Sequence, residues 1–560
     1  MDDATRIPPR EAVVARHADL IESALEAIRS RRAWSPFKDS PSTRIHGPEK
    51  PAAGKAAFEA QRNRPFDLDL PGVLDRVGAE VSPYTGEPLG ISYPRSAPAA
   101  LIEAAEGAMT GWAAADPELR AALCAEMAVR LYEANFEMAH AIMHVAGQSY
   151  TQAFSGSGPN ALDRGIEALA YAVKAMRDVA PSGRYERDFA GERVVLDKTY
   201  RLVPRGIGLV ICCASFPTWN AYPAMFASLA TGNPVIVKPH PIAILPMAIV
   251  VRECRRVLAE HGFDPNLVTL AVDTPDAPVA QVFVDHPAVQ IVDFTGSPRY
   301  GGHLERTVTG KLLFTETAGV NTVVVDSADD LEAVARAVAR ASCLFSAQMC
   351  TSPQVIYVRP DLAEAFGRLL TAQIDAIAAD PAQAAGIMGA IQGDVSLKAV
   401  VAVRGAVQHR PGVEVLREAA PYAHPQFPDA RTLTPLVVAV NGSKPALYAE
   451  EHFGPVRFVV RMDADAAVAE ATRLARENGS ISSYLYSTDE AFIARSEPLY
   501  EQAGANLTIN LTGAMWINFA AAYSDYHVSG LNPAGNACLA DLAFVASRFR
   551  IVQRRRPATA

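Results

Sequence analysis

A cysteine and a glutamate, 34 positions apart, are the side chains best suited to covalent chemistry. Cys350 follows an apolar helical segment in FSAQMCTSP, at a point where the chain turns. Its thiol is a candidate nucleophile, although a cysteine in such a segment is more often a small packing residue. Glu316 ends the extended run KLLFTETAG. A carboxylate there is either a surface charge at a strand exit or a general base whose pKa is raised by apolar surroundings.

A glycine-containing junction has the residue types that suit a phosphate group. The segment FTGS follows an apolar strand and precedes a predicted helix, and Gly296 and Gly301 bracket a GxxxxG pattern. Backbone N–H groups at the start of a helix are free to face a pyrophosphate. The pattern lacks the usual G-x-G-x-x-G, so a plain structural turn is the competing interpretation.

Two further segments are candidates for contacts with the rest of a nucleotide. Lys238 ends the apolar strand of NPVIVKPHP, at the edge where a ribose or phosphate would lie; the alternative is a lysine whose amine reaches solvent. In EHFGPV, Glu451 and Phe453 are spaced to hold a ribose and a nicotinamide ring; the alternative is an ordinary turn.

The elements around these residues predict an α/β fold. From Gly206 onward, short apolar strands alternate with helices, a rhythm typical of a parallel sheet covered on both faces. Such sheets bind ligands at the carboxyl ends of their strands. A second α/β rhythm begins near Asn321 and continues to about residue 520. Between about 183 and 205 the alternating run RVVLDKTYRLVPR predicts a strand pair, either reaching a partner subunit or forming a surface hairpin.

Composition narrows the class of protein. The chain has 560 residues, 49% of them hydrophobic and 20% charged, which is an ordinary globular balance. Its net charge of −9 argues against nucleic-acid binding, and no apolar run is long enough to span a membrane. Seven scattered cysteines and an acidic, polar N-terminus without a signal-type apolar stretch predict free thiols in the cytoplasm. The absence of C-x-x-C and H-E-x-x-H gives a metal site no support, and the basic run RFRIVQRRR is expected to be a solvated end.

Taken in chain order, the motifs resemble those of the aldehyde dehydrogenase superfamily. They are SPYTGEPLG, SFPTWNAYP, GNPVIVKP, FTGS, ETAG, QMC and EHFGP, and the resemblance covers about residues 80–545. It implies a Rossmann-type cofactor domain, an α/β catalytic domain and a small β oligomerisation element. The predicted segments are an N-terminal extension (1–75), the cofactor domain (76–183 and 206–318), the oligomerisation arm with the C-terminal segment (184–205 and 521–560) and the catalytic domain (319–520).

The resemblance also implies a role for each candidate. It makes Cys350 the nucleophile and Glu316 the base that activates the hydrolytic water. The cofactor contacts it implies are Lys238 at the adenosine ribose, Gly296 and Ser297 with the neighbouring Gly301 at the pyrophosphate, Glu451 at the nicotinamide ribose and Phe453 near the nicotinamide.

Three departures from the family pattern affect these roles. Ser215 stands where the family has its oxyanion asparagine, and Asn220, five residues later, is expected on a different face. ETAG replaces E-L-G-G, which keeps the acid and changes the packing after it. Pro241 occupies a position that is often acidic in NAD-preferring members, and His240 is near enough in sequence to approach a 2′-phosphate. The expected cofactor is therefore NADP or NAD, with NADP slightly favoured.

The predicted function is NAD(P)-dependent oxidation of an aldehyde to a carboxylic acid through a thiohemiacetal and a thioester on Cys350. The segment RRAWSPFKDSPS extends the resemblance to the aldehyde dehydrogenases of phenylacetate degradation, which implies a CoA-linked semialdehyde and a homodimer or dimer of dimers. One alternative is a CoA-acylating aldehyde dehydrogenase, against which Glu316 argues. The other is an impaired member that acts by binding, which the joint presence of Cys350, Glu316, Lys238 and Glu451 disfavours.

Overall fold

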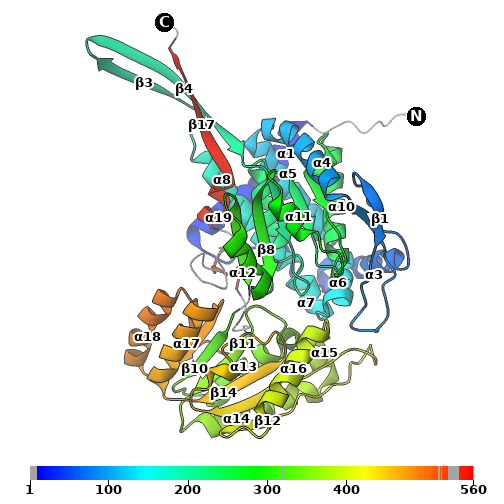
Figure 1. The fold of residues 1–560 in the computed structure, drawn as a ribbon, viewed down its shortest axis with the longest axis vertical. Helices are drawn as coiled ribbons and strands as arrows, with labels where there is room; N and C mark the ends of the chain where they lie inside the picture. The colour runs from blue at the N-terminus through cyan, green and yellow to red at the C-terminus, as the bar shows by residue number, and fades with distance from the viewer. Residues whose placement is uncertain (1–8, 318, 515–517, 519, 528–540, 559–560) are drawn as a thin grey trace.

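The computed structural model describes residues 9–317, 319–514, 518, 520–527 and 541–558, which form two α/β bodies and a narrow β arm (Figure 1). Ala318, the last residue of the predicted cofactor domain, and Cys538 lie outside the described residues, as do parts of the predicted extension and C-terminal segment. The predicted α/β fold with a Rossmann-type sheet is confirmed by the two sheets described below.

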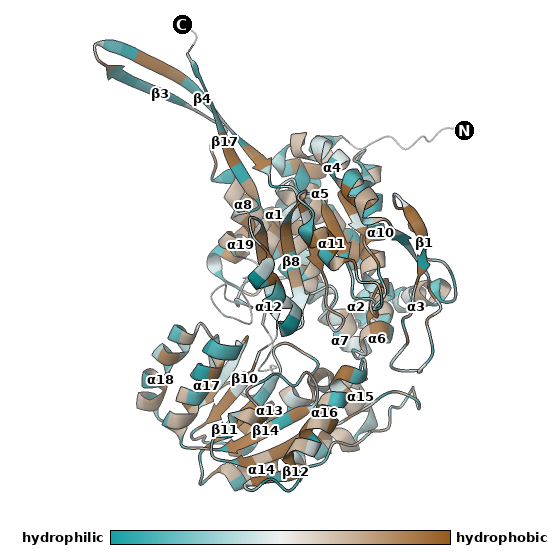
Figure 2. Cartoon of the chain, viewed as in Figure 1, coloured by the Kyte–Doolittle hydropathy of each residue, from teal (hydrophilic) through white to brown (hydrophobic). Residues whose placement is uncertain are grey.

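The first body is built on a five-stranded parallel sheet with the order β7-β6-β5-β8-β9. Most residues of its inner strands are buried valine, isoleucine and leucine, as expected for strands covered on both faces (Figure 2). The carboxyl ends of the strands face the second body (Figure 1). The strands are β5 (Ile207–Ile211), β6 (Val235–Lys238), β7 (Val268–Leu270), β8 (Val289–Gly296) and β9 (Leu312–Thr317).

Helices pack on this sheet and on one another. Helix α8 packs closely against α9 and also contacts α5, and nearly every residue of α8 is buried. Asp116 caps α5 by accepting a hydrogen bond from the Glu118 backbone N–H, and proline begins several helices, where its missing N–H costs nothing. The helices are α4 (Pro98–Ala114), α5 (Pro117–Glu133), α6 (Asn135–Ala146), α7 (Tyr150–Ser155), α8 (Pro159–Arg177), α9 (Ala221–Ala230), α10 (Leu245–Glu260), α11 (Ala280–Asp285), α12 (Pro298–Thr307) and α19 (Leu542–Ala546).

The N-terminal segment packs onto the same body. Helix α1 (Arg10–Ser30) lies against α5 and α8, and α3 (Glu49–Gln61) lies against α6. Val13 and Ile21 of α1 belong to the same hydrophobic core as the helices they contact. The segment therefore adds a layer to the first body. Its other elements are α2 (Thr43–His46) and the antiparallel pair β1 (Val73–Val77) and β2 (Tyr93–Ser96).

The second body has a seven-stranded sheet with the order β12-β13-β14-β11-β10-β15-β16, parallel except for the edge strand β12. Two hydrophobic clusters, one on each face, pack this sheet against its helices. Its strands are β10 (Asn321–Val325), β11 (Pro353–Val358), β12 (Val413–Arg417), β13 (Leu436–Asn441), β14 (Val456–Arg461), β15 (Ser483–Tyr486) and β16 (Leu507–Ile509). Its helices are α13 (Leu331–Cys343), α14 (Ala363–Ala379), α15 (Pro381–Met388), α16 (Asp394–Val407), α17 (Ala464–Asn478) and α18 (Glu490–Ala503).

The arm is a three-stranded antiparallel sheet that projects from the first body (Figure 1). It contains β3 (Ser182–Phe189), β4 (Glu192–Pro204) and β17 (Phe549–Pro557). The expectation that RFRIVQRRR is only a solvated end is wrong, because residues 549–557 pair with residues 196–204 of β4. Contact of the arm with a partner subunit stays a prediction.

Within the described part of the chain, no helix is both long and apolar enough to cross a bilayer.

Candidate active site

A cavity of about 1180 Å³ lies between the carboxyl ends of the first sheet and loops of the second body. All but one of the predicted site residues line it, although their positions in the chain span more than 200 residues. They are Ser215, Lys238, His240, Gly296, Ser297, Glu316, Cys350, Glu451 and Phe453. The fold thus brings the candidate nucleophile, the candidate base and the candidate cofactor contacts to one space.

Gly301 is the exception, because it is not among the residues that line the cavity. It lies within α12, where a Cβ atom would come 2.4 Å from Thr317 Cγ2 and 3.3 Å from a ring carbon of Phe294. A side chain at this position would force Thr317 or α12 to shift. Gly301 therefore has a packing role in the structure, and its pyrophosphate role stays a prediction, while Ser297 caps α12 by accepting a hydrogen bond from the Tyr300 N–H.

A strained turn positions Cys350. After α13 ends, three consecutive residues, Phe345, Ser346 and Ala347, have φ angles of 49°, 46° and 58°. The left-handed conformation costs about 1–2 kcal/mol for each such residue, so the turn needs support from its surroundings. The Ser346 hydroxyl donates to two backbone carbonyls, at 3.2 and 3.3 Å, and the buried Phe345 ring meets Phe216 edge-on at 5.5 Å.

Glutamine side chains tie the Cys350 loop to the first body. Gln348 Oε1 accepts a hydrogen bond from the Gln392 backbone N–H at 2.9 Å, and Gln392 Nε2 donates to the carbonyl of Ala214 at 2.8 Å. Gln148 Nε2 donates to the carbonyl of Ser215 at 2.8 Å. The loop after β5 and the loop before Cys350 are therefore fixed against each other through Gln392, by hydrogen bonds between glutamine side chains and backbone groups.

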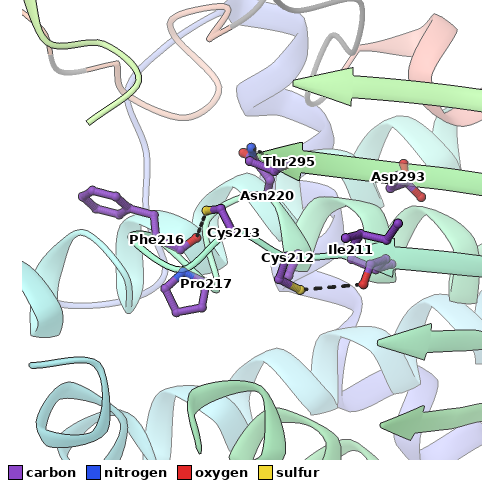
Figure 3. Close-up of a pocket in the computed structure, with 10 residues that line it drawn as sticks. Ile211, Cys212, Cys213, Phe216, Pro217, Asn220, Asp293 and Thr295 are labelled. Atoms are coloured by element: carbon purple, nitrogen blue, oxygen red, sulfur yellow. Dashed lines mark hydrogen bonds between the residues drawn. The ribbon is translucent and has the colours of Figure 1, made fainter. Parts of the chain in front are cut away.

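Glu316 is held by a residue that the sequence reasoning set aside. Its side chain is 2% exposed, and Oε2 accepts a hydrogen bond from Asn220 Nδ2 at 2.6 Å. The same amide donates to the Thr295 hydroxyl at 2.9 Å, beside which it lies at the carboxyl end of β8 (Figure 3). The expectation that Asn220 faces elsewhere is wrong, because the turn that starts α9 brings its side chain back over the sheet. The Ser215 hydroxyl instead lies 4.0 Å from Cys213 Sγ.

Electrostatics keep the Cys350 thiol protonated at rest. Burial raises its pKa well above the ordinary value, and the neighbouring Glu316 carboxylate raises it further. Burial also raises the pKa of the Cys213 thiol and brings that of Glu451 to about 8. A thiolate at Cys350 therefore requires a nearby group that takes its proton or balances its charge.

His527 is a site residue that the sequence reasoning missed. Its Nε2 lies 3.6 Å from Glu316 Oε1, and one side-chain atom each from Glu316, Cys350 and His527 lie within 4.8 Å of one another. The ring meets Trp219 edge-on at 5.5 Å. No motif marks this histidine, since it lies in the stretch that was assigned to the C-terminal segment, and only the tertiary fold reveals it.

The cofactor end of the cavity holds a buried ion pair. Lys238 Nζ donates to Asp273 Oδ1 at 2.6 Å, and Asp273 Oδ2 accepts from the Val279 N–H at 3.1 Å. Asp273 follows β7 and was not predicted. Burial and the nearby Lys238 lower the pKa of His240 to about 4, so this imidazole is neutral near pH 7. The expected attraction of His240 for a 2′-phosphate therefore lacks its charge.

Comparison with known proteins agrees with this geometry. Residues 76–511 match the model described as the aldehyde dehydrogenase family. A crystal structure of an NAD-dependent aldehyde dehydrogenase from Burkholderia multivorans is 42% identical, with a TM-score of 0.94 over 98% of this chain and 99% of that one. A structure of a Thermus 1-pyrroline-5-carboxylate dehydrogenase with bound NAD shares the fold at 19% identity, with a TM-score of 0.72 over 94% of this chain and 100% of that one.

A curated relative carries the same family relation with less coverage. The 1-pyrroline-5-carboxylate dehydrogenase of Bacillus licheniformis is 26% identical over 341 residues, which are 57% of this chain and 62% of that protein. The alignment thus spans less than two thirds of the relative. The match over residues 76–511 and the 42% identity over almost the whole chain are decisive. They agree with a half-buried thiol and a buried carboxylate at the carboxyl edge of a Rossmann-type sheet: the chain belongs to the aldehyde dehydrogenase family.

Proposed function

We propose that this protein oxidises an aldehyde to a carboxylic acid, with NAD as hydride acceptor, through a thioester on Cys350. The observation that carries the proposal is the meeting of Cys350 and Glu316 in the cavity that also contains the Lys238–Asp273 pair. Lys238, Asp273 and the N-terminus of α12 fit a dinucleotide, since they offer partners for ribose hydroxyls and for a pyrophosphate. When bound there, the nicotinamide ring supplies the hydride acceptor.

The residues of this chain account for the remaining chemistry. Cys350 Sγ bonds to the aldehyde carbon, and the Cys350 backbone N–H, with Ser215 as a second donor, stabilises the resulting oxyanion. Once the hydride has left, the acyl group is a thioester on Cys350. Glu316 then takes a proton from water as the water oxygen bonds to the acyl carbon. The C–S bond breaks with its electron pair going to sulfur, and the proton passes from Glu316 to this sulfur, which restores the Cys350 thiol and the carboxylate. Asn220 holds the Glu316 carboxylate in place for this step.

NAD is the proposed cofactor because of Asp273. The slight preference for NADP expected from the sequence rested on the missing carboxylate at Pro241. Asp273 supplies a carboxylate beside Lys238 from another loop, at 2.6 Å. This carboxylate is suited to accept hydrogen bonds from a ribose diol and to repel a 2′-phosphate. The 42% identical relative is itself described as NAD-dependent.

The side chains that line the cavity favour an aldehyde whose portion inside the cavity carries no charge. Among its described lining residues, Lys238 is the one lysine or arginine, and it is paired with Asp273. A substrate carboxylate, as in the compound for which several relatives are named, would find no free cation there. Asp39, from the segment that resembles phenylacetate-degradation enzymes, also lines the cavity. We therefore keep the CoA-linked semialdehyde as the proposed substrate class, with its uncharged thioester inside the cavity and the charged phosphates of CoA outside it.

The test is a cofactor-reduction assay over short aliphatic, aromatic and CoA-linked aldehydes and glutamate semialdehyde, with and without free CoA. We expect NADH formation with free acid as product, undiminished when free CoA is omitted, and highest with an aldehyde that lacks a carboxylate. Cys350→Ala should abolish it while NAD still binds. A strict requirement for free CoA would favour the acylating alternative. Failure of every aldehyde with a protein that still binds NAD would favour a binding role.

We also propose that the arm joins a second copy, giving a homodimer or a dimer of dimers. Exposed apolar side chains on the arm support this, with Phe189 65% and Ile551 55% exposed. Light scattering coupled to gel filtration tests it: Phe189→Ser together with Ile551→Ser should lower the assembled mass. A reducing, cytoplasmic location is proposed because the six described cysteines are all free thiols.

A further inference from the structure

We propose that His527 is a catalytic residue of this centre, accepting the proton of the Cys350 thiol, and that the N-terminal segment holds it in place. The inference rests on the proposed function, because it assigns Cys350 as the nucleophile. It adds a proton acceptor that the motifs do not contain and gives the N-terminal segment a role in the chemistry.

The geometry of the imidazole supports this role. The His527 residue is 4% exposed, and neither ring nitrogen has a hydrogen-bond partner among the residues that the structure describes. A buried imidazole without partners is unusual, because burying an unsatisfied polar group costs free energy. Its Nε2 lies 3.6 Å from Glu316 Oε1, and one of its two ring nitrogens lies within 4.8 Å of Cys350 Sγ. The unsatisfied nitrogen therefore faces the reacting atoms.

The proton balance is simple. In the proposed resting centre Cys350 and His527 share one proton, which is on sulfur because burial raises the pKa of the thiol. As the S–H bond breaks, the proton forms an N–H bond on His527, and the electron pair stays on sulfur. The imidazolium then lies beside both the thiolate and the Glu316 carboxylate, so its positive charge offsets the repulsion between the two anions. After the thioester forms, the proton leaves His527 for solvent, which restores the resting imidazole.

Glu316 alone is a poorer acceptor for this proton. Its Oε2 is occupied by the Asn220 amide, and protonating the carboxylate would remove the base that thioester hydrolysis needs. The charged or titratable groups around the thiol are Glu316 from β9, Cys213 from the loop after β5, Glu451 from the loop before β14, and His527. Of these, the first three are acids and only His527 becomes a cation on taking up a proton.

The N-terminal segment fixes the stretch that carries His527. Trp34 meets the buried Tyr523 ring edge-on at 5.2 Å, and the Arg31 guanidinium lies 4.0 Å above the Tyr526 ring. Arg31 also donates to Glu167 at 3.3 Å, which anchors the segment to α8. The contacts to residues 523 and 526 bracket the approach to His527, so Trp34 and Arg31 are positioning residues for its imidazole.

A buried arginine, Arg164, also fixes the segment of residues 520–527. Arg164 donates to the carbonyl of Asp525 at 2.8 Å and to that of Ala520 at 3.2 Å. Its charge is balanced by Glu167 at 2.9 Å, and both side chains are fully buried. Residues 520–527 are thereby connected to α8 and to the N-terminal segment at once.

The experiment measures the rate at which iodoacetamide alkylates Cys350, without aldehyde or cofactor, as a function of pH. In the wild type the thiol can pass its proton to His527 wherever the pair holds one proton, so the alkylation rate should be nearly constant around neutral pH. His527→Gln removes the acceptor, so the rate at pH 7 should fall about a hundredfold and rise continuously with pH. His261→Gln, at the end of α10 and away from the cavity, is the matched control and should leave the profile unchanged.

Positioning is tested in the same assay. Trp34→Ala should slow alkylation several-fold, Trp34→Phe should restore the rate, and Trp34→Ala should have no further effect when combined with His527→Gln. His527→Asn and a thermal unfolding curve guard against a folding defect. An alkylation profile in both His527 variants that equals the wild-type profile would overturn the proposal. Because no aldehyde is used, failure of the proposed function would show separately, as absence of oxidation by the wild type.

Discussion

Asp273 offers the sharpest test of how this chain selects its cofactor. Asp273→Asn keeps the size of the side chain and its ability to accept from the Val279 N–H, but it removes the negative charge next to Lys238. A ribose 2′-hydroxyl loses a charge-assisted acceptor, whereas a 2′-phosphate loses a repelling neighbour and gains the free Lys238 amine. Both changes act in the same direction on the ratio of the two affinities.

The magnitude follows from the contact. A hydrogen bond to a charged group is worth about 1.5–3 kcal/mol, and about 1.4 kcal/mol corresponds to a tenfold change in Kd. The ratio of Kd for NADP to Kd for NAD should therefore fall about tenfold to a hundredfold. The variant is also expected to unfold at a lower temperature, because removing one member of a buried ion pair leaves Lys238 without its counter-ion.

The assay is calorimetric titration of NAD and NADP without aldehyde, supported by thermal unfolding with each dinucleotide. NADP should raise the unfolding temperature of Asp273→Asn more than NAD does, because its phosphate takes the place of the lost carboxylate. Asp276→Asn, exposed in the same loop, is the control and should change neither ratio. An unchanged ratio in Asp273→Asn would refute the assignment of selectivity to this carboxylate.

Three further predictions concern catalysis, pH and stability. Glu316→Gln should give a burst of about one NADH per active site followed by slow turnover, seen by stopped-flow absorbance; loss of the burst itself would place Glu316 earlier in the reaction. Burial raises the pKa of Glu451 from 4.5 to about 8, so between these pH values the folded state holds a proton that the unfolded state has lost. The free energy of unfolding should therefore fall as pH rises through this range. In thermal unfolding, Glu451→Gln should make this pH dependence weaker. The fully buried Arg548 guanidinium donates to the two carboxylate oxygens of Asp293 at 2.6 and 2.9 Å. Asp293→Asn removes this charged partner and should lower the free energy of unfolding by about 3–5 kcal/mol, measured by urea titration. An unchanged urea midpoint would contradict this prediction.

The sequence predicted the two α/β bodies because the strand and helix periods are strong and local. The apolar strand that ends at Lys238 and the strand that ends at Glu316 are both recognisable from residue type alone. Their side chains meet in the cavity because parallel strands share one carboxyl edge. The sequence pattern therefore predicted correctly that site residues at the ends of these strands lie in one cavity.

Residues that reach the site through loops or distant segments were beyond this reasoning. Asn220 was set aside because residue counting ignores the turn that returns its side chain to Glu316. Asp273 and His527 come from loops whose direction depends on tertiary packing, and β17 pairs with β4 across more than 300 residues of chain. The close packing of Gly301 against Thr317 was also not foreseen, because a sequence does not distinguish a glycine required for packing from one required near a phosphate.

The left-handed turn of residues 345–347 also limits how the neighbourhood of the nucleophile can vary during evolution. A side chain branched at Cβ fits this backbone poorly, whereas glycine, asparagine and aspartate tolerate it. Most single replacements at these positions would raise the conformational free energy of the turn before they changed any contact with substrate. The backbone conformation therefore restricts which residues are accepted at these positions. The number of residues between α13 and Cys350 is expected to change more slowly than the residue types that line the cavity.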